Sequence, residues 1–95
     1  MKIWLDDQRE PPDASWKLVK STDEFLYLLS VIGTGSVTDV SFDYDLGLSA
    51  SGYDCAKLLV QYCFIAGIQL PRLSCHSQNP VGRGQIERLI EEAEE

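Results

Sequence analysis

Carboxylates stand directly after two apolar runs of this sequence. Asp6 and Asp7 follow the run 3–5, and Asp43 follows the run 37–42. One acid after a strand predicts no more than a turn, but the joint pattern favours a site. Carboxylates that meet repel one another, which either raises a proton affinity or recruits a cation. Ligands that are all oxygen suit a hard ion, so we expect Asp6, Asp7 and Asp43 to bind Mg²⁺ or Mn²⁺.

A second polar group follows the apolar run 70–75. His76 is the sole histidine and titrates near neutral pH, so it can serve as a catalytic acid or base, although a lone histidine is also often structural. Ser77 comes next, and Asn79 with Pro80 predicts the start of a helix. The free N–H groups of such a start can hold a phosphate.

Two arginines lie close to these polar groups in the sequence. Arg83 stands between Gly82 and Gly84 in the first turns of the last predicted helix, and Arg9 stands in the loop after Asp6 and Asp7. Either guanidinium can contact a phosphate or pair with a carboxylate. We therefore count both among the candidate phosphate ligands, together with Ser77 and Asn79.

The apolar periodicity predicts the elements that position these residues. Short apolar runs predict four strands, at residues 3–5, 16–20, 37–42 and 70–75. Helical spacing predicts three helices, which begin after the capping box 21–24, near Gly52 or Tyr53, and at Asn79–Pro80. Gly33 and Gly67 are expected to end the first two helices.

Strands that alternate with helices predict an α/β fold. We expect one domain over residues 1–95, with three layers and a four-stranded parallel sheet in the order 2-1-3-4, a truncated receiver or flavodoxin-like arrangement. Helices should cover the faces of the sheet, and its core should contain Trp4, Leu5, Val40 and Phe42. The carboxyl ends of parallel strands meet at one edge, so Asp6, Asp43 and His76 should converge there.

Composition excludes several classes of function. The chain has 95 residues and a net charge of −7, which disfavours a general nucleic-acid surface or binding to an anionic membrane. Its three cysteines are an odd number without a close pair, and they predict small buried side chains in a reducing compartment. No run has the length and apolar character of a leader or a membrane span, so we expect a cytoplasmic protein.

Three sequence blocks carry a resemblance to a known family. Asp6, Asp7 and Asp43 resemble the acids of response-regulator receiver domains, where the first two hold Mg²⁺ and the third accepts a phosphoryl group. The chain is more similar to a compact, divergent receiver-like family that is predicted to process cyclic phosphates. The blocks that match it are WLDDQREPP, FDYDLG followed by Gly52, and HSQNPVGR.

This resemblance implies roles for individual residues. The three aspartates would bind the metal, and contact with or protonation of the phosphate would fall to His76, Ser77, Asn79 and Arg83. A signalling receiver also carries a signature lysine on a fifth strand, whereas no lysine follows Lys57 here.

The candidate residues are compatible with two main functions. The first is a Mg²⁺-dependent phosphoesterase that acts on a cyclic phosphate or a related nucleotide or RNA-end phosphoester, with Asp43 as ligand or as nucleophile and His76 as acid. The second is a non-catalytic module that binds Mg²⁺ and a phosphoryl group or a protein partner. A dehalogenase-type phosphatase ranks last, because its two-acid motif follows the first strand and needs a distant lysine.

Overall fold

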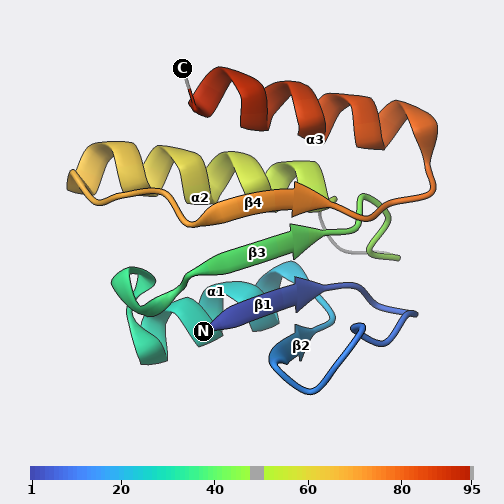
Figure 1. Ribbon diagram of the computed structural model, residues 1–95, viewed down its shortest axis with the longest axis horizontal. Helices are drawn as coiled ribbons and strands as arrows, with labels where there is room; N and C mark the ends of the chain where they lie inside the picture. The colour runs from blue at the N-terminus through green and yellow to red at the C-terminus, as the bar shows by residue number, and fades with distance from the viewer. Residues whose placement is uncertain (48–50, 95) are drawn as a thin grey trace.

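Four short strands and three helices make up the computed structural model, which describes residues 1–47 and 51–94 (Figure 1). The elements follow the predicted order; the last three strands are shorter than the predicted runs, whereas the first is one residue longer. Their bounds are β1 Lys2–Leu5, β2 Trp16–Val19, α1 Thr22–Ile32, a 3-10 turn at Thr34–Ser36, β3 Asp39–Phe42, α2 Gly52–Ala66, β4 Arg72–Cys75 and α3 Pro80–Ala93. None of the helices within these described ranges is long and apolar enough to cross a bilayer.

The sheet is parallel throughout, and its order β2-β1-β3-β4 confirms the prediction. Leu5 pairs with Phe42, and Phe42 pairs with Cys75, so three strands end at the same level. The ladder continues one residue further, because the N–H of Asp43 donates to the Leu5 carbonyl at 2.9 Å and that of His76 donates to the Phe42 carbonyl at 3.0 Å. The residues that follow the strands therefore share one edge.

The helices cover one face of the sheet, which corrects the expectation of three layers. Figure 1 shows the strands in front of α1 and α2, and α2 packs beside both α1 and α3. The crossovers β2–α1–β3 and β3–α2–β4 move in the same direction across the sheet, so right-handed connections place both helices on the same side. The β1–β2 connection moves the opposite way, but its residues 6–15 form a loop without a helix.

The core lies between this face and the helices. Ile3, Leu5, Val40 and Phe42 are fully buried there, and Phe42 packs edge-on against the ring of Phe25 in α1. Trp4 was expected in this core and is not part of it. Side chains alternate along a strand, so Trp4 points to the face without helices and is only partly buried.

Side-chain caps fix the helix starts. The Ser21 hydroxyl accepts from the N–H of Glu24 at 3.1 Å, and Ser51 forms a capping box with Asp54. Asn79 Oδ1 accepts from the N–H groups of Val81 and Gly82, both at 3.1 Å. The predicted caps at Ser21 and Asn79 are thus present, and Asn79 fixes the start of α3 at the edge where the strands end.

Candidate metal and phosphate site

An acidic cluster lies where β1 and β3 end. Asp6, Asp7 and Asp43 each place a carboxylate oxygen so that all these atoms lie within 4.8 Å of one another. Asp6 is 1% exposed and Asp43 is 7% exposed, whereas Asp7 is partly open to solvent. The parallel sheet therefore joins the aspartates as the sequence predicts, in a group that can hold one small cation.

Asp6 is the best-anchored member of the cluster. Its Oδ1 accepts from the backbone N–H groups of Gln8 at 2.8 Å and Arg9 at 3.0 Å, and its Oδ2 lies 3.0 Å from Nε2 of His76. Burial alone would raise the pKa of Asp6, but these hydrogen bonds and the interaction with His76 outweigh it and hold the pKa below its ordinary value. Asp6 is therefore a fixed negative charge at neutral pH.

For Asp43, the effects that raise the pKa outweigh those that lower it. Burial raises the pKa of Asp43, and the neighbouring charge of Asp6 raises it further. A hydrogen bond with the Ser77 hydroxyl and another from the N–H of Tyr44, 2.9 Å from Oδ1, lower this pKa without cancelling the increase. Ionised Asp43 is thus held at an electrostatic cost that a bound cation would remove.

Three contacts hold the ring of His76 in place next to Asp6. Its Nε2 faces Asp6, its Nδ1 lies 2.7 Å from Oγ of Ser41, and its ring stacks on Trp4 with centroids 3.7 Å apart. Burial lowers the pKa of His76, although its hydrogen bond with Asp6 and the Asp6 charge act in the opposite sense. The imidazole is therefore predominantly neutral at neutral pH.

The partners of His76 also assign its tautomer. An ionised carboxylate only accepts, so the proton of the neutral ring belongs on Nε2 and is donated to Asp6. Nδ1 then accepts from the Ser41 hydroxyl. Both ring nitrogens are engaged within the protein, and this geometry suits a residue that orients Asp6 better than one that exchanges protons with a ligand.

A polar pocket of about 510 Å³ opens beside the aspartates. Three residues that the sequence singled out as phosphate ligands, Arg9, Ser77 and Asn79, line it together with Asp7 and Asp43. Its remaining walls are Gln8, Asp45, Gly47 and Gln78. His76 and Asp6 lie behind the pocket and do not line it. The space beside the carboxylates is therefore surrounded by groups that can bind phosphate oxygens.

Two of these phosphate candidates have additional contacts. Arg9 Nη1 donates to the backbone carbonyl of His76 at 3.3 Å, so its guanidinium spans the ends of β1 and β4. Asn79 caps α3 with Oδ1 and places Nδ2 3.3 Å from Oδ2 of Asp45. These contacts hold both side chains at the rim of the pocket.

Arg83 does not join them. It lies on the exposed side of α3, does not line the pocket, and has its Nε 3.4 Å from Oε1 of Glu87 one turn later. Arg83 is close to Asn79 in the sequence, but its side chain pairs with Glu87 along the helix surface and does not line the pocket.

Two glycines allow the helices to approach the site. A Cβ at Gly82 would lie 2.0 Å from Cγ of Tyr44, so this position admits no side chain under the Tyr44 ring. A Cβ at Gly52 would lie 1.7 Å from the backbone oxygen of Asp43. Gly82 therefore allows α3 to pack closely against the Tyr44 ring. A Cβ at Gly84, by contrast, would meet no atom within 4 Å.

Sequence reasoning did not find two residues behind the cluster. Ser41 and Trp4 hold the ring of His76, and both lie on the sheet face opposite the core. A signal existed for Ser41, because it is the polar residue of β3 between the buried Val40 and Phe42. Its partner, however, becomes evident only when β4 is placed beside β3.

A comparison with models of protein families assigns this chain to a family. The model of the cyclic-phosphate processing receiver domain matches residues 1–92. The chain belongs to this family. This cyclic-phosphate processing receiver domain has a receiver-like, all-parallel sheet, and its acidic cluster lies where β1 and β3 end. Nothing matched the chain among curated proteins or among solved structures.

Proposed function

We propose that this receiver-like domain is a Mg²⁺-dependent phosphoesterase that acts on a cyclic phosphate or on a related nucleotide or RNA-end phosphoester. The observation that carries the proposal is the placement of three carboxylates, within 4.8 Å of one another, beside a pocket lined by Arg9 and Ser77. A metal-dependent phosphoesterase needs carboxylates that bind the cation and hydrogen-bond donors that bind the phosphate of the substrate.

The donor set fits Mg²⁺ or Mn²⁺. All three groups offer carboxylate oxygens, which hard divalent ions prefer, and thiols take no part in the cluster. The raised pKa of Asp43 fits as well, because part of its cause is repulsion from the Asp6 carboxylate. A bound divalent cation would polarise the phosphoryl group of the substrate.

The pocket residues would bind and orient the phosphate. Arg9 supplies a positive charge at the rim, and Ser77 supplies a hydroxyl beside Asp43. Asn79 directs its amide group to the same space from the start of α3. A small phosphorylated molecule or the end of a nucleic-acid strand matches this pocket better than a long polyanion does, since the chain carries a net charge of −7.

Asp43 and His76 have separate roles in this proposal. Asp43 acts as a metal ligand or attacks phosphorus directly; in the second role one P–O bond of the cyclic phosphate breaks, the nucleotide stays bound to the carboxylate, and water then releases it. His76 is a positioning residue that acts through Asp6, because both of its ring nitrogens already have partners. Proton transfer from His76 to a leaving oxygen would require its bond with Asp6 to break.

Incubation with Mg²⁺ and a 2′,3′-cyclic nucleotide tests the proposal. We expect release of a nucleoside monophosphate, which Asp43→Asn abolishes and a chelator prevents. Asp39→Asn is the matched control, since Asp39 begins the same strand and pairs with Arg72 at 3.0 Å. The enzyme proposal fails if the intact protein turns over neither cyclic nucleotides nor RNA ends with Mg²⁺ or Mn²⁺.

A non-catalytic module is the second candidate. The observation that favours it is the hydrogen bond between Asp43 and Ser77, since a carboxylate beside a hydroxyl is also the arrangement of a receiver phosphoacceptor. Such a module would bind Mg²⁺ and keep a phosphoryl group or a protein partner. Acetyl phosphate followed by mass spectrometry distinguishes the two: a stable adduct on Asp43 favours the module, and turnover without an adduct favours the enzyme.

A further inference from the structure

Four exposed apolar side chains lie along α2, two of them beside α1 and two on the rim of a groove next to α3. We name them the α2 patch: Leu58, Tyr62, Phe64 and Ile65. Phe64 is 87% exposed and Ile65 is 84% exposed, values that are unusual for large apolar residues of a small soluble domain. Exposed apolar surface of this kind, when it is continuous, indicates an interaction site.

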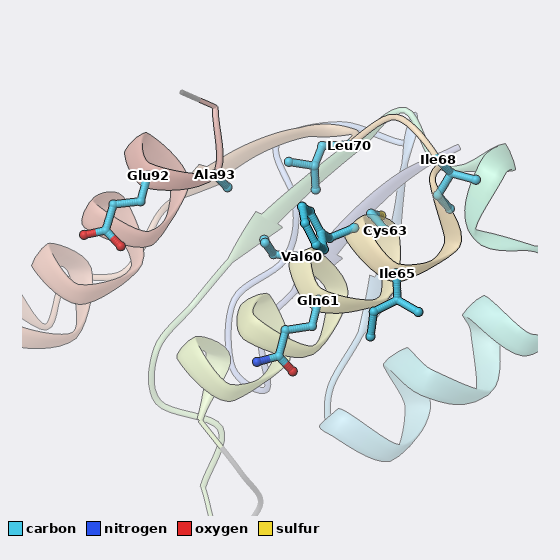
Figure 2. A pocket seen from close by; sticks show the side chains of 9 residues that line it. Val60, Gln61, Cys63, Ile65, Ile68, Leu70, Glu92 and Ala93 are labelled. Atoms are coloured by element: carbon cyan, nitrogen blue, oxygen red, sulfur yellow. The ribbon is translucent and has the colours of Figure 1, made fainter.

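A groove runs beside the patch, between α2 and α3. Its volume is about 610 Å³, and Figure 2 shows Val60, Cys63, Ile68 and Leu70 from the α2 side and Ala93 from α3 around it. Phe64 and Ile65 of the patch belong to the same rim. One surface therefore carries both a protruding phenyl ring and an apolar hollow large enough to accept one.

Few charges lie on this surface, and the charged residue that lines the groove is Glu92 of α3. Residues 58–71 contain no Asp, Glu, Lys, Arg or His, although the net charge of the chain is −7. Two copies of an acidic chain repel each other wherever their carboxylates meet, so they can approach most easily through a surface with few charges. An anionic lipid surface would be repelled by the rest of the molecule.

The area also fits an association between copies. From their exposed fractions, the four side chains of the α2 patch present roughly 500 Å² of surface. The partly exposed walls of the groove bring this toward the ~800 Å² per partner that a standard interface covers. A surface that has both a protruding side chain and a groove can be self-complementary, as a two-fold interface requires.

We propose that the α2 patch and the adjoining groove form a two-fold homodimer interface, in which Phe64 of each copy enters the groove of the other. The interface does not obstruct the acidic pocket. In Figure 1 the strands point to the right, whereas α2 ends on the left, so the two surfaces lie at opposite ends of the molecule. The proposal is therefore independent of the proposed phosphoesterase activity.

Sedimentation of the full chain tests the interface. Between about 1 µM and about 1 mM, a range that covers weak and moderate dimers, we expect the mass to rise from 10.6 kDa toward twice that value. Phe64→Asp should weaken association at least tenfold, because it places a charge in an apolar interface. Tyr27→Asp is the matched control: Tyr27 is 72% exposed on α1 and lines neither the groove nor the patch.

A second measurement locates the contact. Amide hydrogen exchange of residues 58–66 should slow with rising protein concentration in the wild type and not in Phe64→Asp. Circular dichroism and Mn²⁺ binding should be the same in both proteins, because Phe64 lies far from the acidic pocket. A mass of 10.6 kDa throughout the series overturns the proposal, as does equal association of Phe64→Asp and the wild type.

Discussion

The Nε2 of His76 lies 3.0 Å from Oδ2 of Asp6, although 70 positions separate the two residues in the sequence. The contact exists because β1 and β4 both point to the same edge of the sheet, and β3 between them carries Ser41, which holds the other ring nitrogen. His76 thereby fixes the orientation of a carboxylate within the acidic cluster. Histidines that orient metal-bound carboxylates from behind in this way affect affinity without touching the ion.

We therefore expect His76→Ala to weaken Mn²⁺ binding by about 10- to 100-fold, the usual effect of losing a residue behind the metal ligands. Calorimetric titration with Mn²⁺ measures it. The control is Ser41→Ala, which retains the bond between His76 and Asp6 and should cause a smaller loss of affinity. Unchanged binding in His76→Ala would refute the positioning role.

Asp43 should destabilise the metal-free protein at neutral pH. Burial and the Asp6 charge raise the folded-state pKa of Asp43 above the value of 3.8 for an ordinary aspartate. The folded state thus holds its proton more tightly than the unfolded chain, so this contribution to stability is present at low pH and is lost as pH rises through the folded pKa.

Asp43→Asn should accordingly raise the free energy of unfolding at neutral pH, without metal, by about 0.5 to 2 kcal/mol, the usual gain when a strained functional group is replaced. Urea unfolding in the presence of a chelator measures it. The control Asp39→Asn should bring no gain, because hydrogen bonds of Asp39 with Thr38 and Arg72 lower its pKa. A loss of stability in Asp43→Asn would contradict the electrostatic account of the cluster.

Two glycines of α3 should respond oppositely to the same substitution. Gly82→Ala forces a methyl group to within 2.0 Å of the Tyr44 ring and should cost about 1 to 3 kcal/mol, as overpacking usually does. Gly84→Ala meets open space and should stabilise the helix by about 0.5 to 1 kcal/mol. Thermal unfolding of the two variants gives the comparison, and equal shifts would show that Tyr44 does not restrict this position.

The cysteines should be poorly reactive in the folded state. Burial raises the pKa of the thiol groups of Cys55, Cys63 and Cys75, which lowers the fraction of thiolate that can react. A thiol reagent added at mildly alkaline pH should modify them slowly in native protein and quickly in urea. Rapid native modification of Cys55 or Cys63 would mean that α2 opens readily.

Much of this site could be predicted because the relevant signals are local. An acid after an apolar run marks the end of a strand, and the parallel pairing that helix-strand alternation implies is enough to bring Asp6 and Asp43 together. The contacts of His76 were harder to predict from the sequence. Its position at a strand end was evident, but its contacts with Trp4 and Ser41 depend on which face each side chain takes and on the register of three strands.

The single helical layer and the position of Arg83 escaped prediction for similar reasons. A helix after each strand suggests two covered faces, yet the direction of each crossover decides the face, and both crossovers that contain a helix move the same way. Arg83 is four residues beyond Asn79, but its side chain pairs with Glu87 on the helix surface and does not line the pocket. Proximity in sequence did not indicate direction in space.

Asp6, Asp7 and Asp43 are expected to bind a single divalent cation together. Calorimetric titration of the intact protein with Mn²⁺ and with Mg²⁺, beside Asp43→Asn and the control Asp39→Asn, tests it most directly. We expect one ion per chain in the wild type and in Asp39→Asn, with at least tenfold weaker binding in Asp43→Asn. No saturable binding to the wild type, or equal binding by all three proteins, would contradict it.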